Sequence, residues 1–377
     1  MNFQKLTEYL DQLHEVGIPG CDMAVYQDHK LLYRHCAGHR DHEKQQPMQG
    51  NETYCLYSCT KVFTTCAVMQ LVEKGLIGLD DPVSNYLPEY AEVQVKDENG
   101  AHPARNVMLI RQLMSMQAGL DYDLHAPAID ALVEETKGEA TTRQIAAAIA
   151  KKPLQFEPGS MYQYSLAHDV LAAIVEVVSG KKFSEYLREN IFEPVGIKTM
   201  SFEFNEEIKS RICVQYQYHD ENDTRELLPD GYMNFKLAKN HESGGAGLMG
   251  DVQDYAAFVD ALACGGETAK GESILSPEMI QLWSSNQLEM AAREKFTIPR
   301  LAGFSYALGV RSRQDLKVGG KGSLSEFGWD GAAGSWCMID PEHHLSCFFA
   351  MHVRGYPYAY AVVHYTLRNL IYEAMGL

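Results

Sequence analysis

Segments with the pattern of β-strands occur at the two ends of this 377-residue chain, and segments with helical spacing lie between them. Near the start, residues 22–27 and 31–37 are strand-like runs joined by three residues, which predicts an antiparallel hairpin. Near the end, residues 304–310, 335–339 and 345–353 are short runs, apolar on both alternating faces and separated by turn residues. Strands of this kind need helices on both faces, so we expect the two ends to share one covered sheet.

Helical spacing of apolar residues marks most of the remaining chain. A first helix is predicted from Phe3 to Leu13 and ends before Gly17. Apolar periodicity predicts further helices over 109–116, 141–150, 167–178 and 183–191. A last helix is predicted over 358–375, with a face formed by Val362, Tyr365, Leu370 and Ile371.

The order of these segments predicts an α/β (α+β) fold. An antiparallel sheet flanked by helices would be built from residues 1–80 and 290–377, with a mostly helical region, 81–289, inserted between them. The active site would then lie between the sheet domain and the helical region.

Charge and composition exclude several classes of protein. The formal net charge of −17 disfavours binding to nucleic acid or to an anionic membrane surface. No stretch reaches the roughly 18 apolar residues of a membrane span, and the first residues lack the pattern of a secretory signal. The nine cysteines form no Cys-x-x-Cys pair, so we expect reduced thiols, a cytoplasmic location and no metal site.

Ser58 and Lys61 form the strongest chemical motif. The apolar residues from Val62 to Val72 predict a buried helix that stops at Gly75, and Ser58 would open it with Lys61 one turn later. Residues three apart share a helix face, so the hydroxyl and the amine would lie close together. An apolar environment lowers the pKa of a lysine, which can then accept the serine proton. The spacing alone also occurs by chance, as at Ser179 and Lys182, where Gly180 indicates an ordinary helix end.

Other motifs in the chain are weaker. Residues 245–250 formally match the dinucleotide-binding Gly-x-Gly-x-x-Gly pattern, but no strand precedes them, so a tight loop before a helix at Asp251 is the better interpretation. There is no Gly-x-Ser-x-Gly motif, phosphate-binding loop or His-Glu-x-x-His motif. Two stretches are candidate partners of Ser58: residues 156–166, a turn leading into Tyr164, and residues 327–334, a glycine-rich run before a strand.

Taken in order, these stretches resemble the serine β-lactamase and penicillin-recognising superfamily, specifically the class C β-lactamase-like branch that includes the family VIII carboxylesterases and transesterases. Ser58-Cys59-Thr60-Lys61 looks like the Ser-x-x-Lys motif of that family. The segments 79–88 and 111–120 are similar to those that follow it, and 156–165 is similar to the second motif. The resemblance covers nearly the whole chain and implies a β-lactamase/transpeptidase-like fold.

Two departures from the β-lactamase pattern concern the substrate. The second motif of those enzymes is Tyr-x-Asn, and here the Asn position is Leu166. The third is Lys-Thr-Gly, and here it is Trp329-Asp330-Gly331, which resembles the esterases of the branch. An aromatic wall suits a neutral acyl or alcohol group better than an anionic one.

The resemblance implies acyl transfer through a covalent intermediate on Ser58, with Lys61 and Tyr164 sharing general base and general acid roles. It also implies an oxyanion hole made by the backbone N–H groups of Ser58 and Ala332. The remaining candidates for substrate contact are Tyr122, Leu166, Trp329, Asp330 and Gly331.

Hydrolysis of small carboxylic esters is therefore the predicted activity, with no metal or organic cofactor required. A β-lactamase or D,D-peptidase activity and an acyltransferase or transesterase activity remain as alternatives. A binding protein without activity is the least favoured, because the three chemical positions hold competent residues.

Overall fold

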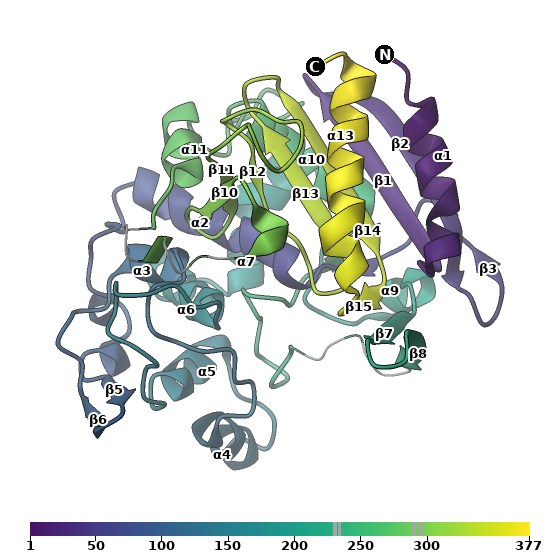
Figure 1. Cartoon of the computed structure of the whole chain (residues 1–377). Helices are drawn as coiled ribbons and strands as arrows, with labels where there is room; N and C mark the ends of the chain where they lie inside the picture. The colour runs from purple at the N-terminus through teal and green to yellow at the C-terminus, as the bar shows by residue number, and fades with distance from the viewer. Residues whose placement is uncertain (229–231, 233–234, 289–291, 294–295, 297) are drawn as a thin grey trace.

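An eight-stranded antiparallel sheet forms the centre of the computed structural model, which describes residues 1–228, 232, 235–288, 292–293, 296 and 298–377. Its strand order is β10-β11-β12-β13-β14-β1-β2-β3, so strands from the two ends of the chain lie side by side (Figure 1). The strands are β1 (Gly20–Gln27), β2 (Lys30–Asp41), β3 (Gln46–Pro47), β10 (Phe304–Tyr306), β11 (Arg311–Arg313), β12 (Phe327–Gly328), β13 (Trp336–Asp340) and β14 (Leu345–Met351). The predicted hairpin and the predicted shared sheet are thus confirmed.

Strand β14 shows why this sheet needs cover on both faces. All seven of its residues are buried, and Phe348 and Ala350 belong to one core while Phe349 and Met351 belong to another. Alternate side chains of a strand point to opposite faces, so apolar residues at every position demand helices on both sides.

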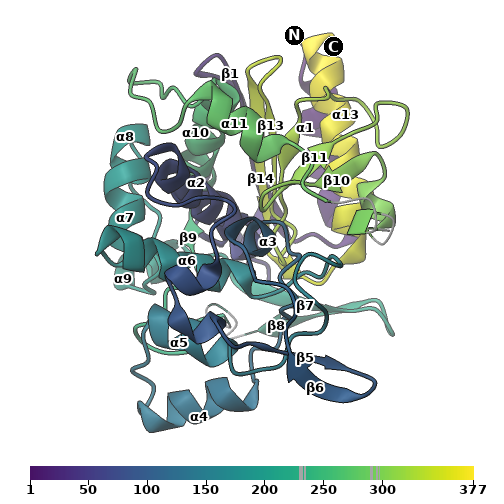
Figure 2. The ribbon, with the colours of Figure 1, turned by 90° about the vertical axis from the view of Figure 1, so that its left-hand side faces the viewer.

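Helices supply that cover. On one face lie α1 (Gln4–Gln12) and the last helix, α13 (His364–Met375), whose ends place the two termini next to each other (Figure 1). On the other face lie α2 (Thr60–Glu73) and α10 (Val252–Ala263), followed by the rest of the helical part (Figure 2). The remaining described α-helices are α3 (Ile110–Met114), α4 (Pro127–Glu135), α5 (Thr142–Ile149), α6 (Ala167–Ser179), α7 (Phe183–Leu187), α8 (Glu193–Val195), α9 (Glu206–Arg211) and α11 (Pro277–Ser284).

Three small sheets complete the described strands: β15-β7-β8, β4-β9 and β5-β6. Their strands are β4 (Tyr54–Cys55), β5 (Gln94–Asp97), β6 (Gly100–Pro103), β7 (Gln215–His219), β8 (Thr224–Leu228), β9 (Met249–Gly250) and β15 (Val353–Arg354). Within the described part of the chain, no helix combines the length and the apolar character needed to cross a bilayer.

Two expectations about the C-terminal part need correction. Residues 304–310 are one strand in the prediction but form β10 and then a turn, because Gly309 takes a φ of 75° and the Ala307 N–H closes the turn on the Val310 carbonyl at 2.8 Å. In the last helical segment Ile371 is buried as predicted, but its buried neighbours are Val363 and Leu367, and the predicted Tyr365 is exposed.

The buried residues of this segment recur every four positions, from Ala359 through Val363 and Leu367 to Ile371, and Tyr365 lies outside that stripe. The proposed division of the chain into domains stays a prediction, and its boundary at residues 289 and 290 lies outside the described residues.

Candidate active site

Ser58 lies in a tight turn that runs directly into α2. Residues Tyr57–Cys59 form a single 3-10 turn, and Tyr57 has a φ of 47°. A positive φ is uncommon for a residue other than glycine and is typical of strained functional turns. The Tyr57 ring packs edge-on against Phe235 at 5.6 Å, which helps to hold this backbone in place. Ser58 itself is partly exposed, whereas the helix that follows it is buried from Thr60 to Leu71.

Lys61 is fully buried beneath Ser58. Its Nζ lies 3.3 Å from the Ser58 Oγ and donates a hydrogen bond to the Gly245 carbonyl at 2.8 Å. Burial lowers the pKa of Lys61 to about 7, although the nearby Asp169 carboxylate opposes that shift. A large fraction of Lys61 is therefore neutral near pH 7 and able to accept a proton from the serine.

Gly245 is essential to this arrangement. A Cβ atom at this position would lie 2.6 Å from an Asp169 carboxylate oxygen and 3.5 Å from the Lys61 Nζ. The glycine therefore lets its own backbone approach the lysine closely. The sequence pattern around it formally matches a nucleotide-binding loop, but in the structure the segment leads through β9 to the N-cap Asp251 of α10, as the loop interpretation expects.

Tyr164 is the centre of an aromatic stack beside Ser58. The indole Nε1 of Trp329 donates to the Tyr164 hydroxyl at 3.1 Å, and the rings of Trp329 and Tyr122 stack on Tyr164 with centroid distances of 5.7 and 5.5 Å. The Lys61 Nζ lies 4.6 Å from the Tyr164 ring centroid. Burial raises the pKa of the Tyr164 phenol, and interactions with Ser58 and Trp329 partly oppose the rise. The phenol is thus protonated and placed to pass a proton on.

The backbone at Gly331 and Ala332 lies against the Ser58 turn. A Cβ atom at Gly331 would lie 2.5 Å from the Leu56 carbonyl oxygen and 2.2 Å from the Ser335 Oγ, so only glycine allows this approach. The Tyr360 hydroxyl donates to the carbonyls of Gly331 and Ala332 at 2.9 and 2.8 Å. The Ala332 N–H has no hydrogen-bond acceptor among the described residues, which leaves it free for a ligand.

A cavity of about 320 Å³ opens above Ser58. Its walls combine aromatic rings with one ion pair. The lining residues are Ser58, Tyr162, Tyr164, Ile298, Arg300, Trp329, Asp330, Gly331, Ala332 and Tyr360.

Six of the predicted site residues therefore line one cavity: Ser58, Tyr164, Trp329, Asp330, Gly331 and Ala332. Lys61 and Tyr122 lie behind them, in contact with the Tyr164 ring. Leu166 is not brought to this cavity. It is buried at the start of α6 and lines a separate, much smaller cavity with Leu120 and Ile129.

Asp330 does not present a free negative charge to the site. Arg300 Nη1 lies 2.6 Å from its carboxylate oxygen, and the Asp330 side chain is largely buried. Sequence reasoning missed Arg300, Tyr162, Ile298 and Tyr360. Tyr162 lies inside the recognised segment 156–166 but was not singled out, whereas Arg300 and Tyr360 carry no local signal.

One group of potential metal ligands occurs among the described residues, formed by His29, Asp260 and Cys264. The His29 Nδ1 and an Asp260 carboxylate oxygen already form a hydrogen bond at 2.8 Å. The group lies at the β1–β2 turn and the end of α10, and none of its members lines the cavity above Ser58.

Comparison with known proteins shows the family of this chain. A model of the family described as Beta-lactamase matches residues 4–371. The chain belongs to the beta-lactamase family. This family member is 30% identical to esterase EstB of Burkholderia gladioli over 68% of the chain and 69% of EstB. It is also 24% identical to a putative D-alanyl-D-alanine carboxypeptidase of Escherichia coli K12, over 91% of this chain and 80% of that protein.

Solved structures extend the likeness of this beta-lactamase-family chain to its whole length. EstCE1, described as a hydrolase with promiscuous acyltransferase activity, superposes with a TM-score of 0.78 at 25% identity, covering 99% of this chain and 98% of EstCE1. The simvastatin synthase LovD of Aspergillus terreus superposes with a TM-score of 0.80 at 22% identity, covering 100% of this chain and 98% of LovD. The β-lactamase/transpeptidase-like fold is thereby established.

Proposed function

We propose that this protein is a serine hydrolase that cleaves small carboxylic esters through an acyl-enzyme on Ser58. The observation that carries the proposal is the buried Lys61, whose Nζ lies 3.3 Å from the Ser58 Oγ and whose pKa burial lowers to about 7. A lysine in this state is a competent base near neutral pH. The esterase relatives EstB and EstCE1 support the same class of reaction.

The first half of the reaction forms the acyl-enzyme. The Ser58 Oγ attacks the ester carbonyl carbon while its proton passes to Lys61, directly or through Tyr164. The carbonyl oxygen gains negative charge and accepts hydrogen bonds from the N–H groups of Ser58 and Ala332. When the C–O bond to the alcohol breaks, the proton returns to the alkoxide, and the alcohol leaves.

The second half releases the acid. Water attacks the acyl-enzyme and gives its proton to the same base, and the Ser58 oxygen takes the proton back as it departs. These steps need only side chains and backbone groups already placed at the site. The Tyr164 phenol adjoins Ser58, Lys61 and Trp329 and is suited to carry the proton between them.

The cavity favours a neutral group next to the scissile bond. Trp329 occupies the position where β-lactamases have a lysine, and its indole faces the cavity together with Tyr162 and Ile298. A small-molecule ester is the proposed substrate. A cytoplasmic location, the absence of nucleic-acid partners and the absence of a required cofactor stay predictions.

Transfer of the acyl group to a second alcohol is the next candidate. It is favoured because EstCE1, which matches this chain along almost its full length, is described as having promiscuous acyltransferase activity. The chemistry differs only in whether water or an alcohol attacks the acyl-enzyme.

A panel of p-nitrophenyl esters of graded chain length, assayed beside nitrocefin and a D-alanyl-D-alanine peptide, tests the proposal. Short-chain esters should be the best substrates, and an added primary alcohol should yield a new ester only if transfer competes with hydrolysis. Ser58→Ala should abolish ester cleavage without loss of folding, and a fluorophosphonate should label the Ser58 peptide. Labelling of a different serine, with Ser58→Ala still active, refutes the assignment.

A further inference from the structure

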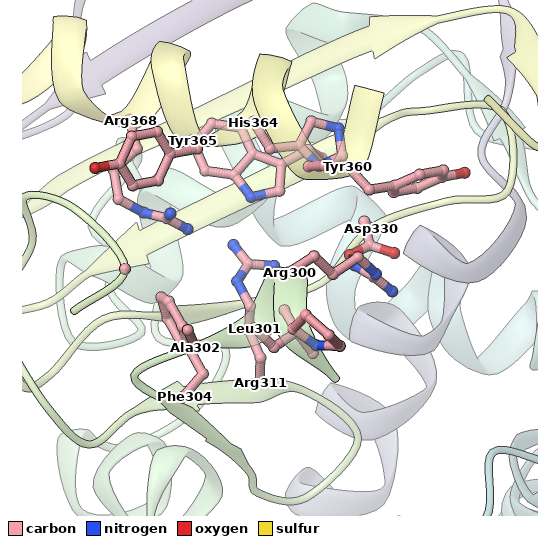
Figure 3. Close-up of a pocket in the computed structure, with 14 residues that line it drawn as sticks. Arg300, Leu301, Ala302, Phe304, Arg311, Asp330, Tyr360, His364, Tyr365 and Arg368 are labelled. Carbon is pink, nitrogen blue, oxygen red and sulfur yellow. The ribbon is translucent and has the colours of Figure 1, made fainter. Parts of the chain in front are cut away.

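A second cavity, of about 190 Å³, adjoins the one above Ser58. It lies between the C-terminal helical segment and the residues around Pro299–Leu301, with β11 at its base (Figure 3). Arg300, Asp330 and Tyr360 line both cavities, so they form the wall between them. These three side chains therefore separate the second cavity from the proposed catalytic site.

Three guanidinium groups converge on this cavity, from Arg300, Arg311 and Arg368. Two of them have acidic partners: Arg300 pairs with Asp330 at 2.6 Å, and the Arg368 Nε pairs with Glu326 at 2.9 Å. Within the part of the chain that the structure describes, Arg311 makes no ion pair with a carboxylate. The three arginines thus carry one more positive charge than the two paired carboxylates, Asp330 and Glu326, neutralise.

Arg311 is the decisive residue because it is only 1% exposed. Its Nη2 donates to the Cys337 carbonyl at 2.7 Å, but its buried Nη1 has no hydrogen-bond partner among the described residues. Figure 3 shows the guanidinium projecting from β11 into the space beneath the C-terminal helix. A guanidinium stays charged even when buried, and a buried charge without a partner is strongly unfavourable.

The remaining surroundings suit an anion as well. The Trp336 ring lies under the guanidinium groups of Arg311 and Arg368, at 5.6 and 5.3 Å from its centroid. Planar guanidinium groups recognise carboxylates through pairs of parallel hydrogen bonds. His364 adds no charge, since burial lowers its pKa to about 3.

The geometry points to a carboxylate-binding subsite of the catalytic site, centred on Arg311, for a substrate that carries a carboxylate several bonds away from the scissile ester. This inference rests on the proposed esterase function. The substrate class is then half-esters of dicarboxylic acids, or other esters whose acyl group ends in a carboxylate. A carboxylate next to the scissile bond would remain on the Ser58 side of the Arg300–Asp330 pair and would not reach Arg311.

Matched substrates test the subsite. The mono-p-nitrophenyl esters of adipic and suberic acid carry a distal carboxylate, and their methyl esters are neutral analogues of nearly the same shape. The unmutated protein should cleave at least one acid with a kcat/KM about 10-fold or more above its methyl ester, as expected for a charge-assisted hydrogen bond. Arg311→Gln should reduce that ratio to about one while leaving the methyl esters within about threefold, and Arg311→Lys should restore part of it.

A second pair of variants tests the subsite without replacing the buried Arg311, so it stays informative even if the Arg311 variants misfold. Ala361 lines the same cavity but is exposed, so substitutions there leave the core intact. Ala361→Glu brings a negative charge to the cavity and should abolish the preference for the acids, whereas the matched Ala361→Gln should keep it. A ratio near one in the unmutated protein, or a preference that survives both Arg311→Gln and Ala361→Glu, overturns the inference.

Binding measured without catalysis separates this inference from the esterase proposal. Calorimetric titration of Ser58→Ala protein with the methyl half-ester of adipic acid should show binding that Ala361→Glu weakens about 10-fold, even if no ester is hydrolysed. Absence of hydrolysis alone counts against the esterase function only. If acetate or phosphate binds in an Arg311-dependent way but the ester pairs show no preference, the site serves a free anion and the substrate subsite is refuted.

Discussion

Lys61 must be neutral to accept the Ser58 proton, and burial lowers its pKa to about 7. The active form of a base is the deprotonated one, so kcat/KM for a neutral ester should fall about tenfold per pH unit below pH 7 and level off above it. Rates of p-nitrophenyl butyrate hydrolysis between pH 5 and 9 give this profile. Lys61→Arg, which stays protonated, should lose activity by about 10²-fold or more. A profile that is flat through pH 7 would show that another group is the base.

The Tyr164 hydroxyl should matter more than any other phenol of the cavity. Tyr164→Phe preserves the stack with Tyr122 and Trp329 but removes the hydroxyl to which the Trp329 indole donates. The turnover number should drop by about 10²-fold or more if the proton passes through this group. Tyr162→Phe, at the same cavity, is the matched control and should stay within about threefold. A loss below about threefold in Tyr164→Phe would mean that Lys61 acts alone.

Trp329 should determine the preference for neutral substrates. A carboxylate beside the scissile bond meets an indole here instead of a lysine, and the missing charge-assisted hydrogen bond is worth roughly 1.5–3 kcal/mol. Short-chain esters should therefore exceed nitrocefin in kcat/KM by about 10²-fold. Trp329→Lys should narrow this gap, whereas Trp329→Phe, which adds no charge, should not. Since Arg300 neutralises Asp330, repulsion by that carboxylate adds little to the preference.

At the scale of elements, the turn between β12 and β13 brings the backbone of the proposed oxyanion hole against the turn that precedes α2. Gly331→Ala would place a methyl group against the Leu56 carbonyl and the Ser335 hydroxyl, so the turn must move away from Ser58. The turnover number should decrease about 10²- to 10³-fold, as for the loss of an oxyanion donor, with a smaller change in KM. The melting temperature distinguishes this effect from unfolding.

Local periodicity explains which elements were predictable. The first hairpin and α2 each show their pattern within one continuous segment, and Ser58 and Lys61 meet within a single turn. Arg300 and Tyr360 come from distant segments and face the site only because the sheet and the last helix meet there. The role of Gly245 was equally hidden, since its contact with Lys61 joins parts of the chain 184 residues apart. Sequence patterns report neighbours along the chain far better than neighbours in space.

At the scale of the whole molecule, the site is assembled from three separate parts of the chain. The N-terminal part contributes Ser58 in the turn before α2, the helical middle contributes Tyr164, and the turn between β12 and β13 contributes Trp329 and Ala332. None of these parts holds a complete site by itself. Catalytic activity therefore reports the correct packing of the whole molecule.

The pairing of β1 with β14 governs when this protein can complete its fold. Cys21 of β1 lies opposite Met351 of β14. The edge of β1 that faces β14 therefore stays unpaired until almost the entire chain has been synthesised. An unpaired, apolar strand edge is a template for association with other chains. A fragment ending at Asp340 should therefore aggregate, as light scattering would detect, whereas one ending at Gly355, which retains β14, should scatter less despite lacking the last helix. During synthesis, the interval between these two points is when the nascent chain most needs protection by chaperones.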